Sequence, residues 1–267
     1  MFQKQTKNVQ YLKTVITQLN RDINDSIRKK DIETEEIRVK LLALTYSAWS
    51  EAQFTQIIYT PNAFTIDEIN SMIKIKSIFG KWEKLINLSF EKIETYKYIE
   101  KEKNMQKLKD ENRNSEIQIL CQEFQNHNNL IKEKKDEITY FLKKYIKEPS
   151  SIRNKIAHGQ WINALDDSEI RAKEPPPNPH LKINFDLTDK LSKLNPLSIM
   201  REFEVHTELG QIIRKIIEFK SKGFTSEYDI HMNKIKLRLE ETESFTMERK
   251  REKLIKVYSS YQKQREN

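Results

Sequence analysis

The sequence predicts an all-α protein, a helical bundle with long polar helices and a small β-hairpin or extended insertion at about 160–186. Glycine and proline are scarce, with 4 and 7 among 267 residues, and large β-sandwiches or Gly-rich phosphate-binding folds use more turn residues than that. Leu, Ile and Phe recur at helical intervals, and the Lys-, Glu- and Gln-rich remainder favours helix. Hydrophobic residues make up 37% of the chain, which is enough for a modest core.

Composition also excludes several classes of protein. The single cysteine, Cys121, rules out an internal disulfide framework and a Cys-based zinc cluster. No apolar run approaches the ~20 residues of a membrane-spanning helix, and the N-terminus lacks a hydrophobic signal region, so we expect a cytoplasmic protein without membrane contact. The formal net charge of +8 is compatible with nucleic-acid binding, but a solvated Lys-rich surface explains it more simply.

Helical periodicity and breaker residues define the individual elements. We expect helices over these ranges: 1–30, 33–59, 65–80, 82–108, 116–147, 152–158, 188–193 and 197–222. Thr65 begins the third of them because acidic residues fill the first turn that follows, and Gly80 kinks or ends it. The polar stretch 101–115 is either an exposed helix or a loose connection. Cys121 falls on the apolar stripe of the next helix, so we expect a buried thiol.

Proline and glycine mark a change of structure near the middle of the chain. Pro149 breaks the long helix, Ser150 or Ser151 caps the next one, and Gly159 ends it. Residues 181–187 alternate at period two, which indicates a strand, and 160–165 is a second candidate strand. A stiff, proline-rich loop at 174–179 lies between them.

A shift in composition suggests the domain organisation. Residues 1–225 form one helical domain that contains the insertion, and residues 226–267 form a charged, helical C-terminal extension. The basic run at 249–251 and the nearby Tyr258 offer the residue types that grip RNA. A solvated helix or an intersubunit coil is the simpler interpretation of the same segment.

The most informative segment places an arginine, an amide and a histidine on one short helix, namely Arg153, Asn154 and His158. Arginine presents a planar fork of donors that suits phosphate, and histidine exchanges protons near neutral pH. Together they are the minimum set for cutting RNA without a metal. His158 would move protons at the 2′-OH and the leaving 5′-oxygen, and Arg153 would bind the phosphate and offset its growing charge. Asn154 would position the phosphate or the histidine.

The run Arg153-Asn154-Lys155-Ile156-Ala157-His158 resembles the shared motif of the HEPN superfamily of α-helical nucleases and toxins, an Arg followed by four to six residues and a His. The resemblance covers this motif and its helical setting. It implies a metal-independent endoribonuclease that dimerises so that both copies of the motif line one cleft. It also implies a toxin or antiphage defence effector, with a protein antitoxin or a defence complex as a possible partner.

Helical geometry constrains how these side chains can cooperate. At 100° per residue, Arg153 and His158 lie about 140° apart around a regular helix, whereas Asn154 and His158 share a face. One helix therefore does not readily aim both the arginine and the histidine at a single phosphate. Either the helix is distorted near Gly159, or two copies of the motif meet about a two-fold axis.

The spacing alone is weak evidence, because the chain contains it twice. Arg201 and His206 are also separated by four residues, but they lack the Asn, the small residue before the His and the Gly after it. We interpret that second pair as incidental to a core-packing helix. For the first pair, the structural alternative is a capped helix that merely packs its isoleucines and leaves Arg153 and His158 at the surface.

Other candidate site residues carry less information. Glu51 lies on the apolar second helix, where a carboxylate would orient His158 or tune its pKa, although a surface glutamate is the simpler interpretation. The histidines at 127, 180 and 231 show no persuasive metal-ligand spacing, so we predict no metal site. No Walker loop or dinucleotide-binding glycine pattern appears, so we predict no cofactor.

Three functions remain open from the sequence. The first is the endoribonuclease, with RNA as its substrate and a homodimer as its active form. The second is a non-catalytic, HEPN-like dimeric scaffold or interaction module. The third is a plain helical protein whose basic tail binds nucleic acid with a steep salt dependence. A nuclease needs Arg153 and His158 exposed in one basic cleft, whereas a scaffold tolerates either of them buried in packing.

Overall fold

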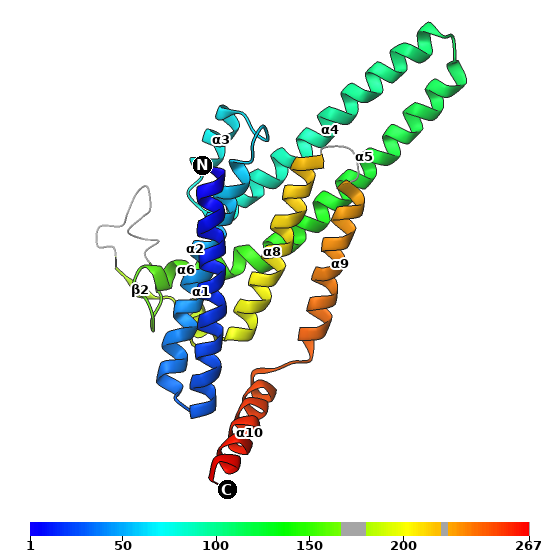
Figure 1. Ribbon diagram of the computed structural model, residues 1–267. Helices are drawn as coiled ribbons and strands as arrows, with labels where there is room; N and C mark the ends of the chain where they lie inside the picture. Colours follow the sequence, from blue (N-terminus) through cyan, green and yellow to red (C-terminus); the bar gives the residue numbers. More distant parts are fainter. Residues whose placement is uncertain (167–179, 220–223, 267) are drawn as a thin grey trace. The chain divides into compact units, whose positions relative to one another are not determined.

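The computed structural model describes residues 1–166, 180–219 and 224–266, and helices dominate those parts of the chain (Figure 1). The helices have these bounds: α1 Phe2–Lys29, α2 Ile32–Ile58, α3 Ile66–Ile73, α4 Ile78–Asp110, α5 Asn114–Leu142, α6 Glu148–Ala157, α7 Phe185–Ser192, α8 Pro196–Phe219, α9 Phe224–Glu243 and α10 Met247–Glu266. Two strands, β1 (Leu165–Asp166) and β2 (Lys182–Ile183), pair antiparallel. The predicted all-α class with a small hairpin is confirmed. No helix among the described residues is long and apolar enough to cross a membrane.

The chain divides into two compact units that do not follow the sequence boundary expected near residue 225. The first unit contains 1–2, 54–146 and 205–237, and the second contains 3–53, 147–204 and 238–267. Helices α2, α8 and α9 each contribute residues to both units.

The first unit is built around the long helices α4 and α5, which run antiparallel and side by side (Figure 1). Its core is apolar and rich in large side chains, which come from α2, α4, α5, α8 and α9. The buried residues include Phe54, Ile57, Trp82, Leu85, Phe90, Ile131, Ile138, Leu209, Ile213, Tyr228 and Ile235. Polar bonds attach α9 to α5. The Lys134 ammonium lies 2.6 Å from the Asp229 carboxylate, and the Tyr228 hydroxyl donates to Glu137 at 2.7 Å.

The second unit packs α1, the first part of α2, α6, α7 and the start of α8 around one apolar cluster. Its buried members include Ile16, Ile23, Leu42, Tyr46, Trp49, Ile156, Leu191 and Phe203. Met247 and Leu254 pack the C-terminal helix α10 against the same cluster. A bidentate ion pair fixes that helix further, since Arg251 donates to the buried Glu35 carboxylate of α2 at 2.6 and 2.8 Å.

Two predicted helix signals are confirmed in atomic detail. Thr65 forms a capping box, in which its hydroxyl accepts from the Glu68 amide and the Glu68 carboxylate accepts from the Thr65 amide. Gly159 adopts a left-handed conformation with φ of 78°, directly after α6. Its amide donates to Ile156 and the next amide, of Gln160, donates to Lys155, which is the Schellman pattern that glycine makes inexpensive.

Several predicted boundaries were wrong. Pro149 does not break the chain, because a π-helical turn at Lys143–Lys147 leads directly into α6, where proline is tolerated in the first turn. Ser150 does not cap α6, since its hydroxyl donates to the Lys147 carbonyl instead. Gly80 neither kinks nor ends a helix. The third helix already ends at Ile73, and Gly80 lies in the first turn of α4.

The predicted burial of Cys121 is also wrong, because the thiol is exposed. Its neighbours on the stripe in this half of α5, Ile117, Leu120 and Phe124, are no more than half-buried. The stripe becomes true core only further along, at Ile131. The polar stretch 101–115 resolves into the end of α4, a turn and the start of α5.

The hairpin is shorter than predicted. Each strand has two residues, with Leu165 opposite Ile183. Phe185–Leu187, expected to extend the second strand, instead begins α7, because the Asn184 side chain accepts from the Leu187 amide and caps that helix. The predicted proline-rich loop at 174–179 lies outside the described residues.

Candidate functional site

The motif residues lie on α6, a helix of ten residues whose C-terminal end is fixed by several backbone bonds. His158 is its C-cap residue, and Gly159 reverses the chain directly after it. Two further contacts tie this end to the hairpin. The Lys155 ammonium donates to the Leu165 carbonyl, and the Gln160 side chain accepts from the Leu165 amide at 2.7 Å. This anchorage could not be predicted from the sequence, because the partners are brought together only by the turn at Gly159.

Arg153 points into the second unit. It is only 2% exposed, and the central carbon of its guanidinium group lies 4.9 Å from the centre of the Tyr46 ring. This distance is within the range of a cation–π interaction, which is worth most where water is excluded. The arginine thus packs with the core of the unit and is not presented to solvent.

Tyr46 itself is fully buried on α2. Its hydroxyl donates to the Glu202 carbonyl at 3.3 Å, and its ring contacts Phe203 edge-on with centroids 6.1 Å apart. Burial raises the pKa of the Tyr46 hydroxyl, and the neighbouring positive charge of Arg153 opposes that rise. The raised pKa keeps the Tyr46 hydroxyl protonated beside the Arg153 guanidinium.

Asn154 and His158 lie on the opposite side of α6 and are exposed. They are one helical turn apart, and the His158 amide donates to the Asn154 carbonyl at 3.1 Å. The structure therefore exposes both Asn154 and His158, one helical turn apart at the end of α6, and buries Arg153. This separation agrees with the angular difference expected from a regular helix.

Glu51 is exposed on α2, next to the buried residues Ser50 and Ala52. Its position on the surface of the helix matches the simpler interpretation of this residue. Among the described residues, no group of three or more His, Cys, Asp or Glu side chains could hold a metal ion. His231 forms a pair with Glu208, whose carboxylate lies 2.6 Å from its Nδ1.

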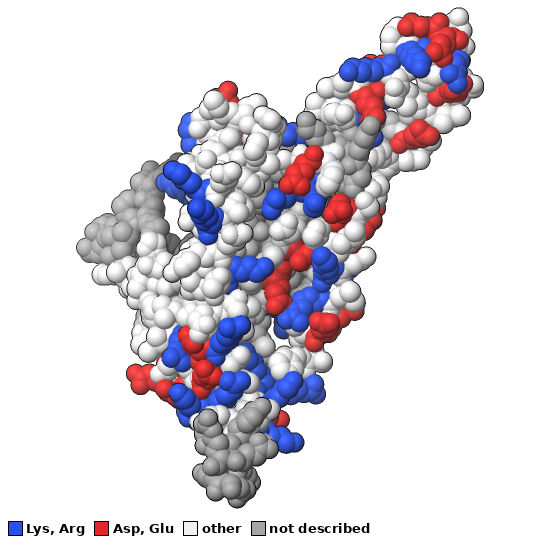
Figure 2. Space-filling view, viewed as in Figure 1, with Lys and Arg blue, Asp and Glu red and all other residues white. Residues whose placement is uncertain are grey.

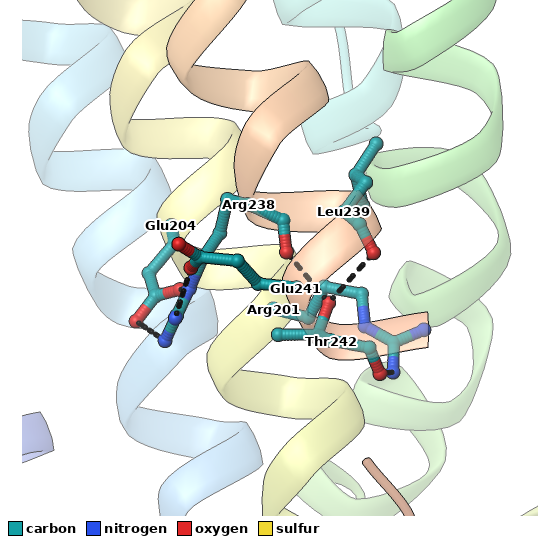
Figure 3. A network of polar contacts seen from close by, with 6 residues as sticks. All are labelled: Arg201, Glu204, Arg238, Leu239, Glu241 and Thr242. Atoms are coloured by element: carbon teal, nitrogen blue, oxygen red, sulfur yellow. Dashed lines mark hydrogen bonds and ion pairs between the residues drawn. The ribbon is translucent and has the colours of Figure 1, made fainter. Parts of the chain in front are cut away.

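The second arginine–histidine pair on α8 has a different environment. Arg201 is half-buried and donates to the Thr242 carbonyl at 3.2 Å, in the same network as the ion pair between Glu204 and Arg238 (Figure 3). His206 is completely buried, and its ring meets Trp82 edge-on with centroids 4.5 Å apart. Both contacts hold helices together.

The chain was compared with protein families, curated proteins and solved structures. No family matches it, and neither a curated protein nor a solved structure is significantly similar.

Proposed function

We propose that the protein is an endoribonuclease that cleaves RNA through attack by the substrate's own 2′-OH, with His158 as the proton-transfer residue. The observation that carries the proposal is the exposed end of α6, where His158 and Asn154 lie together on one face. An accessible imidazole can exchange protons near neutral pH, and the adjacent amide can hydrogen-bond a phosphate oxygen.

The burial of Arg153 changes the role that its position in the motif suggests. A guanidinium that is 2% exposed and packed over Tyr46 does not reach a phosphate at the surface. We therefore assign Arg153 as a positioning residue, which holds α6 on α2 and so fixes the direction in which His158 faces. Asn154 takes the substrate-binding part of the proposal.

Cleavage requires both a base and an acid. One imidazole takes the proton from the 2′-OH, the 2′-oxygen bonds to phosphorus, and a second imidazole donates a proton to the departing 5′-oxygen. The products are a 2′,3′-cyclic phosphate and a 5′-hydroxyl. Each chain supplies one His158, so the proposal includes a two-fold homodimer in which two copies of the α6 end meet.

A non-catalytic interaction module is the second candidate, and the burial of Arg153 favours it. If Arg153 serves only to pack α6, the exposed face that carries His158 has no catalytic role. The chain would then act as a scaffold in a toxin or defence complex. The two candidates differ in what His158 does, so substitution of that residue separates them.

The test uses purified full-length chain with tRNA and a mixed RNA pool in EDTA. We expect cleavage by the wild type, cyclic-phosphate ends, and loss of cleavage in His158→Ala. His180→Ala is the matched control, since His180 is an exposed histidine outside the motif, and it should cleave normally. Inactivity of a folded, dimeric wild type would favour the interaction module. Equal cleavage by wild type and His158→Ala would overturn the assignment of this residue.

A further inference from the structure

A second candidate site lies in the first unit, on the surface formed by α4 and α5. A groove of about 750 Å³ runs between the two helices. Its lining contains the aromatic rings of Tyr98 and Phe124, the amides of Asn128 and Asn129, the Thr95 hydroxyl, and the charged groups of Glu94, Lys132, Lys135 and Asp136. We call this the α4–α5 groove.

The two rings are available for stacking. Tyr98 is 54% exposed, although it is a large aromatic residue. Its ring and that of Phe124 have centroids 6.5 Å apart and planes inclined at 62°, so they meet edge to face and leave part of the exposed Tyr98 ring open to a ligand. The ammonium of Lys101 lies 4.6 Å from the centre of the Phe124 ring, at the same end of the groove.

Positive charge and an unsatisfied amide lie next to the rings. Neither Lys132 nor Lys135 forms an ion pair with any residue in the described parts of the chain. The side-chain oxygen of Asn128 is shielded from solvent, yet it accepts no hydrogen bond from a described residue. Buried polar atoms nearly always have partners, so the Asn128 oxygen would gain one if its side chain turned toward a ligand in the groove.

The residues form one continuous strip. Phe124, Asn128 and Lys132 follow each other at intervals of four on α5, so they share a face. From Phe124 to Lys135 the helix rises about 16 Å, enough for a few consecutive nucleotides. The charged residues of the lining balance, with Lys132 and Lys135 against Glu94 and Asp136, and the visible face of the paired helices α4 and α5 also carries side chains of both signs (Figure 2). Charge alone therefore does not define the site, and stacking must supply much of the affinity.

We propose that the α4–α5 groove binds single-stranded RNA, with bases stacked on Tyr98 and Phe124 and the sugar–phosphate chain beside Lys101, Lys132 and Lys135. Every base offers a π-face, so such a site is sequence-tolerant, and the lysines contact phosphate. Glu94 and Asp136 also line the groove and repel phosphate, so they reduce the electrostatic part of the affinity. This inference goes beyond the proposed cleavage and does not depend on His158.

The experiment measures binding with cleavage chemically blocked. A fluorescein-labelled 2′-O-methyl uridine dodecamer has no free 2′-OH, so its binding reports the groove even if the nuclease proposal fails. Fluorescence anisotropy with the full-length chain should show saturable binding. Since three lysines contact the strand, the logarithm of the affinity should fall with the logarithm of salt with a slope of about −2.

Substitutions localise the binding. Tyr98→Ala should weaken binding about tenfold or more, the usual loss for one stacking ring, and Lys132→Ala/Lys135→Ala should weaken it and flatten the salt dependence. The matched controls are Tyr11→Ala and Lys4→Ala/Lys7→Ala, which remove exposed residues of the same types from α1. Tyr98 is exposed, so its variant keeps the fold, and circular dichroism verifies that.

A second readout does not depend on affinity. A 5-iodouridine at the centre of the dodecamer should photocrosslink to a peptide that contains Tyr98 or Phe124. Absence of binding at 50 mM salt overturns the proposal, as does binding that the control variants weaken and the groove variants do not. Self-association or capture of a protein segment that Tyr98→Ala abolishes, with no RNA binding, would identify the groove as a protein interface and would also overturn it.

Discussion

The same arginine–histidine spacing occurs in two helices of this protein, with opposite burial. On α6, Arg153 is buried and His158 is exposed, whereas on α8 Arg201 is half-buried and His206 is fully buried. Five residues correspond to about 140° around a helix, so a helix that packs one of the pair against its core turns the other away. The spacing therefore does not define a site. The environment of each side chain decides which of the pair meets solvent.

Arg153 and His206, the buried residue of each pair, both pack against an aromatic ring. Arg153 lies over an aromatic ring of α2, and His206 lies against an aromatic ring of α4. Each is a polar side chain in an apolar core, and its guanidinium plane or imidazole ring packs against an aromatic neighbour. Stability should therefore depend on Arg153 in the first pair and on His206 in the second.

The largest expected effect comes from the two arginines. Arg153→Ala should lower the free energy of unfolding by about 3 kcal/mol, because it removes the contact with the Tyr46 ring and opens a cavity in the core of the second unit. Arg201→Ala should cost about 1 kcal/mol, since it removes one hydrogen bond from a side chain that is partly solvated. Urea denaturation of the two variants measures the difference. Equal losses would contradict the contrast between the two helices.

The histidines should show the reverse order. His206→Ala opens a cavity beside Trp82 and should cost about 2 kcal/mol. His158→Ala changes an exposed side chain and should stay within about 0.5 kcal/mol of the wild type. Thermal unfolding distinguishes them, and an intact His158→Ala fold is also what makes the cleavage assay interpretable. A large loss in His158→Ala would mean that this histidine is structural.

A third prediction concerns Lys250, a buried cation whose burial makes the stability of the protein depend on pH. Burial lowers the pKa of Lys250 to about 8, and the nearby carboxylate of Glu35 only partly opposes this. The folded state then binds fewer protons than the unfolded state between about pH 8 and 10.5, so stability should rise with pH across that window by about 2 kcal/mol. Lys250→Met should abolish the rise. The exposed Lys253→Met is the control and should retain it.

The smallest expected effect concerns the end of α6. Gly159→Ala should lower stability by about 1 kcal/mol, because alanine is strained at a φ of 78° even though its methyl group would meet no atom within 4 Å. Gly159→Asn should cost less, since asparagine tolerates this conformation better. Chemical denaturation of both variants tests the order. If alanine proves as good as asparagine, the turn after His158 is not held in its left-handed form.

Much of the fold could be predicted because its signals are local. The Thr65 capping box and the Gly159 turn depend on residues within a few positions of each other. Most helices predicted from apolar periodicity are present in the structure. The break at Pro149 failed for a local reason too, since a π-helical turn satisfies the backbone where a cap was expected. Cys121 failed because periodicity identifies an apolar face but does not show whether another element covers it.

The candidate site was predictable only in part. The shared face of Asn154 and His158 follows from helical geometry alone. The burial of Arg153 does not, because its partner Tyr46 lies more than a hundred residues earlier in the chain. The α4–α5 groove gave no sequence signal either, since its two rows of side chains become neighbours only when the two helices pair.

The division of the chain into two units has a consequence for anyone who shortens the gene. The polypeptide passes from one unit to the other five times, after residues 2, 53, 146, 204 and 237. Neither unit is therefore encoded by one uninterrupted stretch, and no single stop codon or alternative start removes one and spares the other. A protein that ends at residue 225 would lack most of α9, which belongs largely to the first unit, and all of α10, which belongs to the second. Fragments cut at compositional boundaries are thus a poor guide to what each part does, whereas point substitutions in the intact chain probe each unit separately.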